Sequence, residues 1–153
     1  MKTTVIMLAD ANVFLRFLLN DQPKESFAAK KLIEEAVAGS IILRVPEIVV
    51  AEIFYALTAA AITRQLAAKQ LAALLHQAGI DIENRQRVFD ILNACETKNI
   101  DYGDAALIVA SLDTENKVPI LSQNPNFAEA HEIISFSPIE WLQKGRKLVK
   151  AAG

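Results

Sequence analysis

Apolar residues along the chain fall into short β-branched runs separated by longer stretches with helical spacing. The run TTVIMLA, residues 3–9, is typical of a strand buried on both faces. SIILRV, IDI, KVPILS and EIIS predict further strands. Helical spacing predicts helices over residues 12–20, 24–39, 46–62, 63–79, 83–99, 101–116 and 137–153.

Strands that alternate with helices predict an α/β fold with a mainly parallel central sheet. A chain of 153 residues, 52% of them hydrophobic, is long enough to bury one core and suits a single domain over residues 1–153. In such folds, functional sites gather beyond the carboxyl ends of the strands. Asp10 lies at such a place, directly after the first predicted strand.

Charge and cysteine content exclude several classes of protein. The net charge of −2 argues against a protein that coats nucleic acid through a strongly basic surface. One cysteine, Cys95, excludes an internal disulfide and a cysteine zinc site. The N-terminus reads poorly as a signal peptide, and no apolar run reaches the roughly 20 residues of a membrane helix. We therefore expect a soluble, cytoplasmic protein.

Three acids stand within apolar stretches of the sequence. Asp10 lies in TTVIMLADANVFLRFLLN, Glu52 in PEIVVAEIFYAL and Asp104 in NIDYGDAALIVASL. An unpaired carboxylate in an apolar interior costs several kcal/mol, in round terms about 3–5, so each of these acids needs a partner or an exposed position.

Two interpretations of these acids remain open at this point. Asp10 can cap the helix that follows it, and Asp101 with Asp104 has the spacing of a cap and a first-turn acid. Glu52 lies in the middle of a helix, where capping does not apply. Carboxylates brought together repel one another unless a cation lies among them. Oxygen ligands suit Mg²⁺ or Mn²⁺, and the lack of clustered His and Cys argues against zinc.

The same segments resemble a known family. LADANVFLRFLL, VAEIFYAL, and DYGDAALIVASL followed by VPILSQNPNF look like the successive motifs of PIN-domain ribonucleases, especially VapC-type toxins of toxin–antitoxin modules. The resemblance runs over nearly the whole chain in the right order. It implies a single-domain three-layer α/β/α sandwich with a Mg²⁺ or Mn²⁺ site that cuts single-stranded or looped RNA. It also implies an antitoxin protein as partner, and a homodimer.

Carried onto this sequence, the resemblance matches Asp10, Glu52 and Asp104 to the acidic metal-site positions. Accessory positions fall on four further residues: Asn12, Asp101, Ser122 and Asn124. Asn124 stands where the family usually has a fourth aspartate, and Asn126 stands where a further acid often occurs. An amide oxygen can ligate a metal but supplies no negative charge, so a second cation is expected to bind more weakly.

RNA must approach an acidic pocket, which makes nearby cations of interest. Arg16 follows Asp10 by six residues, and Arg44 ends the second predicted strand. Either arginine can contact phosphate, and either can instead be solvated or pair with an acid.

Two alternatives differ from a catalytic ribonuclease. Asn124 and Asn126 leave room for a PIN-like module that has lost catalysis and binds RNA or a protein partner. A haloacid dehalogenase-like phosphatase matches poorly, because it needs a second aspartate where Asn12 stands.

Overall fold

The structure is a computed structural model that describes residues 3–113, 115, 117–130, 132–145 and 147. The chain divides into two compact units, Met1–Ala105 and Ala106–Gly153. Within the described residues, no helix is both long enough and apolar enough to cross a membrane.

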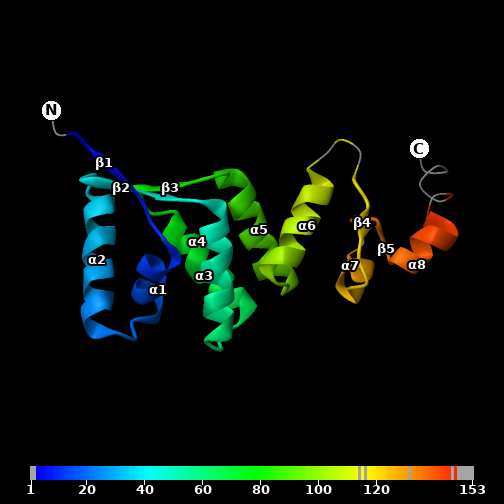
Figure 1. The fold of residues 1–153 in the computed structure, drawn as a ribbon, viewed down its shortest axis with the longest axis horizontal. Helices are drawn as coiled ribbons and strands as arrows, with labels where there is room; N and C mark the ends of the chain where they lie inside the picture. Colours follow the sequence, from blue (N-terminus) through cyan, green and yellow to red (C-terminus); the bar gives the residue numbers. More distant parts are fainter. Residues whose placement is uncertain (1–2, 114, 116, 131, 146, 148–153) are drawn as a thin grey trace. The chain divides into compact units, whose positions relative to one another are not determined.

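Strands and helices alternate along the first unit, as the sequence predicts. The order is β1 (Val5–Leu8), α1 (Ala11–Leu19), α2 (Pro23–Val37), β2 (Ile41–Val45), α3 (Glu47–Ala59), α4 (Arg64–Leu75), β3 (Ile80–Ile82), α5 (Arg85–Lys98) and the start of α6 (Tyr102–Leu112) (Figure 1). Strand β2 lies between β1 and β3 and pairs with both in parallel. The carboxyl ends of all three strands therefore share one edge of the sheet.

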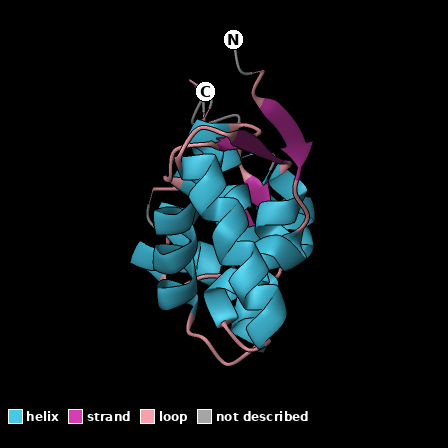
Figure 2. Ribbon diagram, turned by 90° about the vertical axis from the view of Figure 1, so that its left-hand side faces the viewer, coloured by secondary structure: helices cyan, strands magenta, loops and turns pink. Residues whose placement is uncertain are grey.

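The first strand departs from the sequence prediction. All four residues of β1 are exposed, from 38% at Met7 to 76% at Leu8, so the expectation of a strand buried on both faces is wrong for this sheet. The physical reason is its position in the first unit: among the described residues of that unit β1 pairs with β2 alone, so it lies at the margin of this three-stranded sheet (Figure 2). The middle strand β2 instead buries alternate residues.

The core of the first unit is built mainly by α3, α4 and α5. Helix α3 buries one face, with Val50, Ile53, Phe54 and Leu57 fully enclosed. Helix α4, whose sequence RQLAAKQLAALL is rich in alanine and leucine, belongs largely to this core. The buried residues of α4 are Ala67, Ala68, Leu71, Leu74 and Leu75. Small side chains allow neighbouring helices to approach closely, which explains the composition of α4 without requiring a partner protein.

Cys95 on α5 belongs to the same core, the role expected of a lone cysteine that can form neither an internal disulfide nor a cysteine zinc site. Its side chain is completely buried and forms no disulfide. Burial raises the pKa of its thiol to about 12, because the thiolate would lose its hydration. The thiol is therefore neutral at physiological pH and acts as a small apolar residue.

The second unit contains the end of α6 and a series of short elements beyond it. In order these are β4 (Ile120–Leu121), α7 (Pro125–Glu129), β5 (Ser135–Phe136), α8 (Pro138–Glu140) and the π-helical turn η1 (Trp141–Gly145). Strands β4 and β5 pair in parallel. The predicted closing helix over 137–153 begins with a capping box of Ser137 and Glu140, and residues 146 and 148–153 lie outside the described part.

Helix α7 was not predicted from the sequence. Its start carries two recognisable signals, an Asn124 side chain that caps the helix and Pro125 in its first turn. Five residues are too few for hydrophobic periodicity to show, so only the cap could have indicated this helix.

Candidate active site

Asp10 lies at the carboxyl edge of the sheet, between β1 and α1. Its backbone is extended, and its Oδ1 atom accepts a hydrogen bond from the backbone N–H of Asn12 at 3.1 Å. The predicted capping role is therefore present. The side chain is exposed, so it carries little of the burial penalty that the sequence pattern implied. Capping uses one carboxylate oxygen and leaves Oδ2 available for a ligand.

Glu52 projects from the middle of α3. The buried residues of this helix lie on another face, and the Glu52 side chain is exposed. The expectation that α3 leaves little surface for water is therefore not met at this position. Among the described residues, Glu52 has no hydrogen-bond or ion-pair partner. A carboxylate held on a rigid core helix without a protein partner is well placed to receive an external cation.

Asp104 lies in the first turn of α6 and is half-buried. Its backbone N–H donates to Oδ1 of Asp101 at 2.9 Å, so Asp101 caps this helix as its spacing predicts. The adjacent N–H of Gly103 donates to the Tyr55 hydroxyl of α3 at 2.8 Å. Helix α3 is thus joined directly to the first turn of α6.

All three acids belong to the first unit and lie on elements that α3 connects. Helix α1, which Asp10 caps, packs against α3, and the first turn of α6 is bonded to α3 through Tyr55. The donors fit Mg²⁺ or Mn²⁺ in kind, because all are carboxylate oxygens. Among the described residues, however, no three His, Cys, Asp or Glu side chains are grouped closely enough to hold a metal ion. The structure brings the acids onto connected elements without assembling them into a ligand set.

Comparison with protein families places the chain in a known family. The model of the PIN domain family matches residues 7–133, a region that includes all three acids. The chain belongs to the PIN domain family. Its α/β fold with parallel strands is the three-layer α/β/α class predicted from the sequence. PIN domains are generally nucleases that act on RNA and generally use divalent metal ions. A comparison with curated proteins finds none that matches the chain.

The accessory residues of this PIN domain lie in both units. Asn12 is exposed in α1, where its backbone N–H is taken by Asp10. In the second unit, the hydroxyl of Ser122 accepts from the N–H of Asn124, and Oδ1 of Asn124 accepts from the N–H of Asn126, each at 3.0 Å. The geometry of Ser122 and Asn124 is that of a turn leading into α7. Their predicted part in a metal site stays a prediction.

Both arginines expected near RNA lie in ion pairs of the PIN domain's first unit. Nη1 of Arg16 is 2.9 Å from Asp21, and Nε of Arg44 is 2.9 Å from Asp81. Arg44 and Asp81 are register partners on β2 and β3, so the parallel pairing brings them together. An exposed ion pair is worth at most about 1 kcal/mol and can be exchanged for a phosphate contact. The RNA-contacting role of the two arginines stays a prediction.

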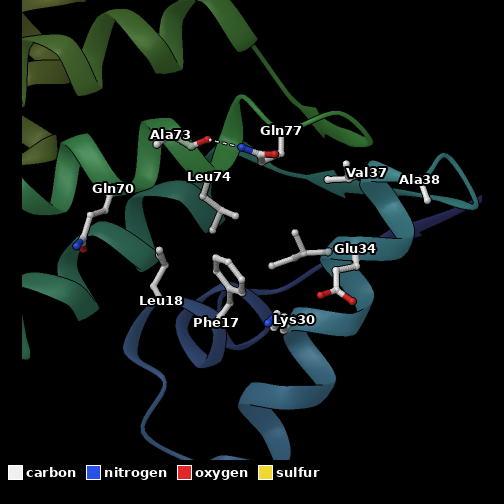
Figure 3. Close-up of a pocket in the computed structure, with 11 residues that line it drawn as sticks. Phe17, Leu18, Lys30, Glu34, Val37, Ala38, Gln70, Ala73, Leu74 and Gln77 are labelled. Atoms are coloured by element: carbon white, nitrogen blue, oxygen red, sulfur yellow. Dashed lines mark hydrogen bonds between the residues drawn. The ribbon is translucent and has the colours of Figure 1, made fainter.

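An apolar groove lies elsewhere in the first unit of the PIN domain, between α1, α2 and α4 (Figure 3). Its volume is about 730 Å³. Phe17 and Leu74 point toward one another inside it, and Lys30 and Glu34 lie at its side. None of the three acids lines this groove, so the cavity and the carboxylates are separate features.

Sequence reasoning missed Tyr55, which contacts the first turn of α6. Its hydroxyl donates to Oδ1 of Asp101 at 3.4 Å and accepts from Gly103. Burial is the largest cause that raises the pKa of Tyr55, and the Asp101 and Asp104 charges add to it. A weak signal was present in the sequence, since Tyr55 follows Glu52 by one helical turn.

Asp101 offers a test between capping and a metal role. We expect Asp101→Asn to keep the free energy of unfolding within about 0.5 kcal/mol of the wild type, because Asn caps helices as well as Asp. Asp101→Ala is expected to lose about 1 kcal/mol. Urea denaturation of both variants measures this difference. If Asp101→Asn lost nuclease activity while remaining as stable as the wild type, Asp101 would be an accessory acid and not only a cap.

Proposed function

We propose that this PIN domain is a cytoplasmic, metal-dependent endoribonuclease of the VapC toxin type, which hydrolyses phosphodiester bonds in single-stranded or looped RNA. The observation that carries the proposal is the set of three carboxylates within the matched region, presented by elements that α3 connects. Oxygen-only donors and a fold whose members are generally nucleases both support it.

Each acid has a distinct place in the proposed site. Asp10, Glu52 and Asp104 would hold one Mg²⁺ or Mn²⁺ ion, with Asp10 fixed by its cap and Glu52 without a hydrogen-bond or ion-pair partner in the described part of the chain. When bound, such an ion supplies Lewis-acid stabilisation to a phosphodiester under attack by water. Without a cation, carboxylates brought together repel one another, so a bound ion would offset this repulsion.

Cleavage of labelled RNA tests the proposal directly. The purified chain, freed of any co-purifying protein, is incubated with single-stranded and hairpin RNA in Mg²⁺, in Mn²⁺ and in EDTA. We expect internal cleavage in either metal, loss of cleavage in EDTA, and recovery when Mn²⁺ is added in excess. Cleavage that persists undiminished in EDTA would refute the metal-dependent mechanism.

A second candidate function is a PIN-like module that binds RNA or protein without cutting. The favouring observation is Asn124, whose amide oxygen caps α7 and supplies no charge where the family usually has an acid. The Asn124→Asp variant separates the two functions, because Asp caps equally well and restores the charge. A large gain of nuclease activity from near zero supports the module. Wild-type cleavage that this substitution leaves unchanged supports the ribonuclease.

If the chain is of the VapC type, two proposals about its partners follow. One is an antitoxin protein encoded separately, and the other is a homodimer of this chain. Light scattering on the purified chain tests the second, since the monomer has a mass of 16.8 kDa and a dimer twice that mass. A single species of monomer mass over the range of working concentrations would exclude the homodimer.

A further inference from the structure

Tyr55 joins two helices that each carry one of the proposed metal ligands. The hydroxyl accepts from the N–H of Gly103 at 2.8 Å and donates to Oδ1 of Asp101 at 3.4 Å. Gly103 directly precedes Asp104, whose own N–H is bonded to the same Oδ1 atom of Asp101 at 2.9 Å. One hydroxyl on α3 therefore contacts the donor and the cap that together define the first turn of α6.

The space between Gly103 and this hydroxyl is small. A Cβ atom placed on Gly103 would lie 3.0 Å from the Tyr55 hydroxyl oxygen, closer than nine in ten real contacts of this kind. The Tyr55 ring packs edge-on against Phe54, with centroids 5.7 Å apart and planes at 85°. Phe54 is fully buried, so one side of the Tyr55 ring rests on the core, while Tyr55 itself is 45% exposed.

We propose that Tyr55 is a positioning residue whose hydroxyl holds the first turn of α6 against α3 and thereby sets the separation of the Glu52 and Asp104 carboxylates. Glu52 and Tyr55 are three residues apart and lie on adjacent turns of one helix face. Glu52 is thus connected to Asp104 by one turn of α3 to Tyr55, by the hydrogen bond that the N–H of Gly103 donates to Tyr55, and by the peptide unit between Gly103 and Asp104. This inference rests on the proposed function, because the two carboxylates matter as a pair only if they share a cation.

The consequence for activity follows from geometry. Ligands and reacting groups must be held to within a fraction of an ångström, and a displacement of about 1 Å can cost on the order of a hundredfold in rate. Groups that orient metal ligands typically change metal affinity by about ten- to a hundredfold when removed. Loss of the Tyr55 hydroxyl should therefore act on metal binding and on kcat, and only weakly on KM for RNA.

Tyr55→Phe removes the hydroxyl and keeps the ring. The matched control is Thr58→Val, which removes another hydroxyl from α3, one whose bond among the described residues goes to the carbonyl oxygen of Tyr55. For each protein, Mn²⁺ affinity is measured without RNA by electron paramagnetic resonance of the free ion. Amide hydrogen exchange at Gly103, kcat and KM are measured in parallel. We expect Tyr55→Phe to bind Mn²⁺ at least about tenfold more weakly, with a lower kcat, an unchanged KM and faster Gly103 exchange. Thr58→Val should match the wild type in all four.

Gly103→Ala tests the same contact between Tyr55 and Gly103 by changing Gly103 instead of Tyr55. The added methyl group requires the Tyr55 hydroxyl to shift by a few tenths of an ångström, so we expect a loss of Mn²⁺ affinity in the same direction as that of Tyr55→Phe and no larger. The double variant should be no worse than Tyr55→Phe alone, because both changes break one interaction and their effects do not add. Fully additive losses would overturn the inference.

The outcomes separate this inference from the proposed function. If the wild type binds Mn²⁺ and Tyr55→Phe binds it equally well with the same kcat, the positioning role is overturned and the ribonuclease stands. If the wild type neither binds Mn²⁺ nor cuts RNA, the proposed function falls. Amide hydrogen exchange at Gly103 then tests by itself whether the Tyr55 hydroxyl holds the first turn of α6 against α3. Faster exchange in Tyr55→Phe than in Thr58→Val supports the contact, and equal exchange overturns it.

Discussion

Asp10→Asn abolishes RNA cleavage and leaves the protein folded: this is the largest effect on activity that we expect. Asn caps helices as well as Asp, so the hydrogen bond from Asn12 and the start of α1 are retained. What the substitution removes is negative charge at the proposed metal site. A metal ion contributes several kcal/mol to transition-state stabilisation, and about 1.4 kcal/mol is tenfold, so kcat/KM should fall by at least about a hundredfold.

The measurement combines RNA cleavage in Mn²⁺ with thermal unfolding of the same samples. Asp90→Asn is the matched control, because Asp90 is an exposed aspartate on α5 that is bonded only locally to Gln86. We expect this control to retain full activity. If Asp10→Asn cut RNA within about threefold of the wild-type rate, Asp10 would serve α1 as a cap and nothing more.

Phe54→Ala should destabilise the protein more than any substitution at the site itself. Phe54 is completely buried in α3 and contacts the rings of Tyr55 and Tyr102, with centroids 5.7 and 6.1 Å away. Removing a buried phenyl ring loses its transfer free energy and leaves a cavity, so we expect the free energy of unfolding to fall by about 3–5 kcal/mol.

Urea denaturation followed by circular dichroism measures this loss. Phe27→Ala provides the control, because Phe27 is a phenylalanine of α2 with 62% of its side chain exposed. Its removal should cost about 0.5 kcal/mol or less. A loss below about 1.5 kcal/mol for Phe54→Ala would mean that α3 can collapse into the space. The Glu52 position would then be less firmly held than its helix suggests.

The sequence predicted local structure well, since its signals act over a few residues. Asp10 before α1 and Asp101 before α6 cap their helices as expected, and Thr63 caps α4 in the same way. Apolar spacing located β2 and β3 as well as the long helices. The family and its fold class followed from the ordered motifs.

Features that depend on distant parts of the chain were beyond reach from the sequence. Tyr55 and Asp101 are 46 residues apart, and no pattern in either segment indicates that they meet. The pairing of Arg44 with Asp81 depends on the register between β2 and β3. Exposure of Glu52 depends on which faces of α3 other elements cover, and an apolar sequence around it suggested the opposite.

The buried thiol of Cys95 can also report on how often the core opens. Cys95 is the chain's one cysteine, it is completely enclosed on α5, and its thiolate is negligibly populated near neutral pH. An alkylating reagent can reach it only when this part of the core opens. Under excess reagent, the rate of its capture therefore reports how often α5 separates from its neighbours, without any introduced label. A slower rate of Cys95 alkylation in the presence of Mn²⁺ or RNA would show that the ligand makes opening of the core less frequent.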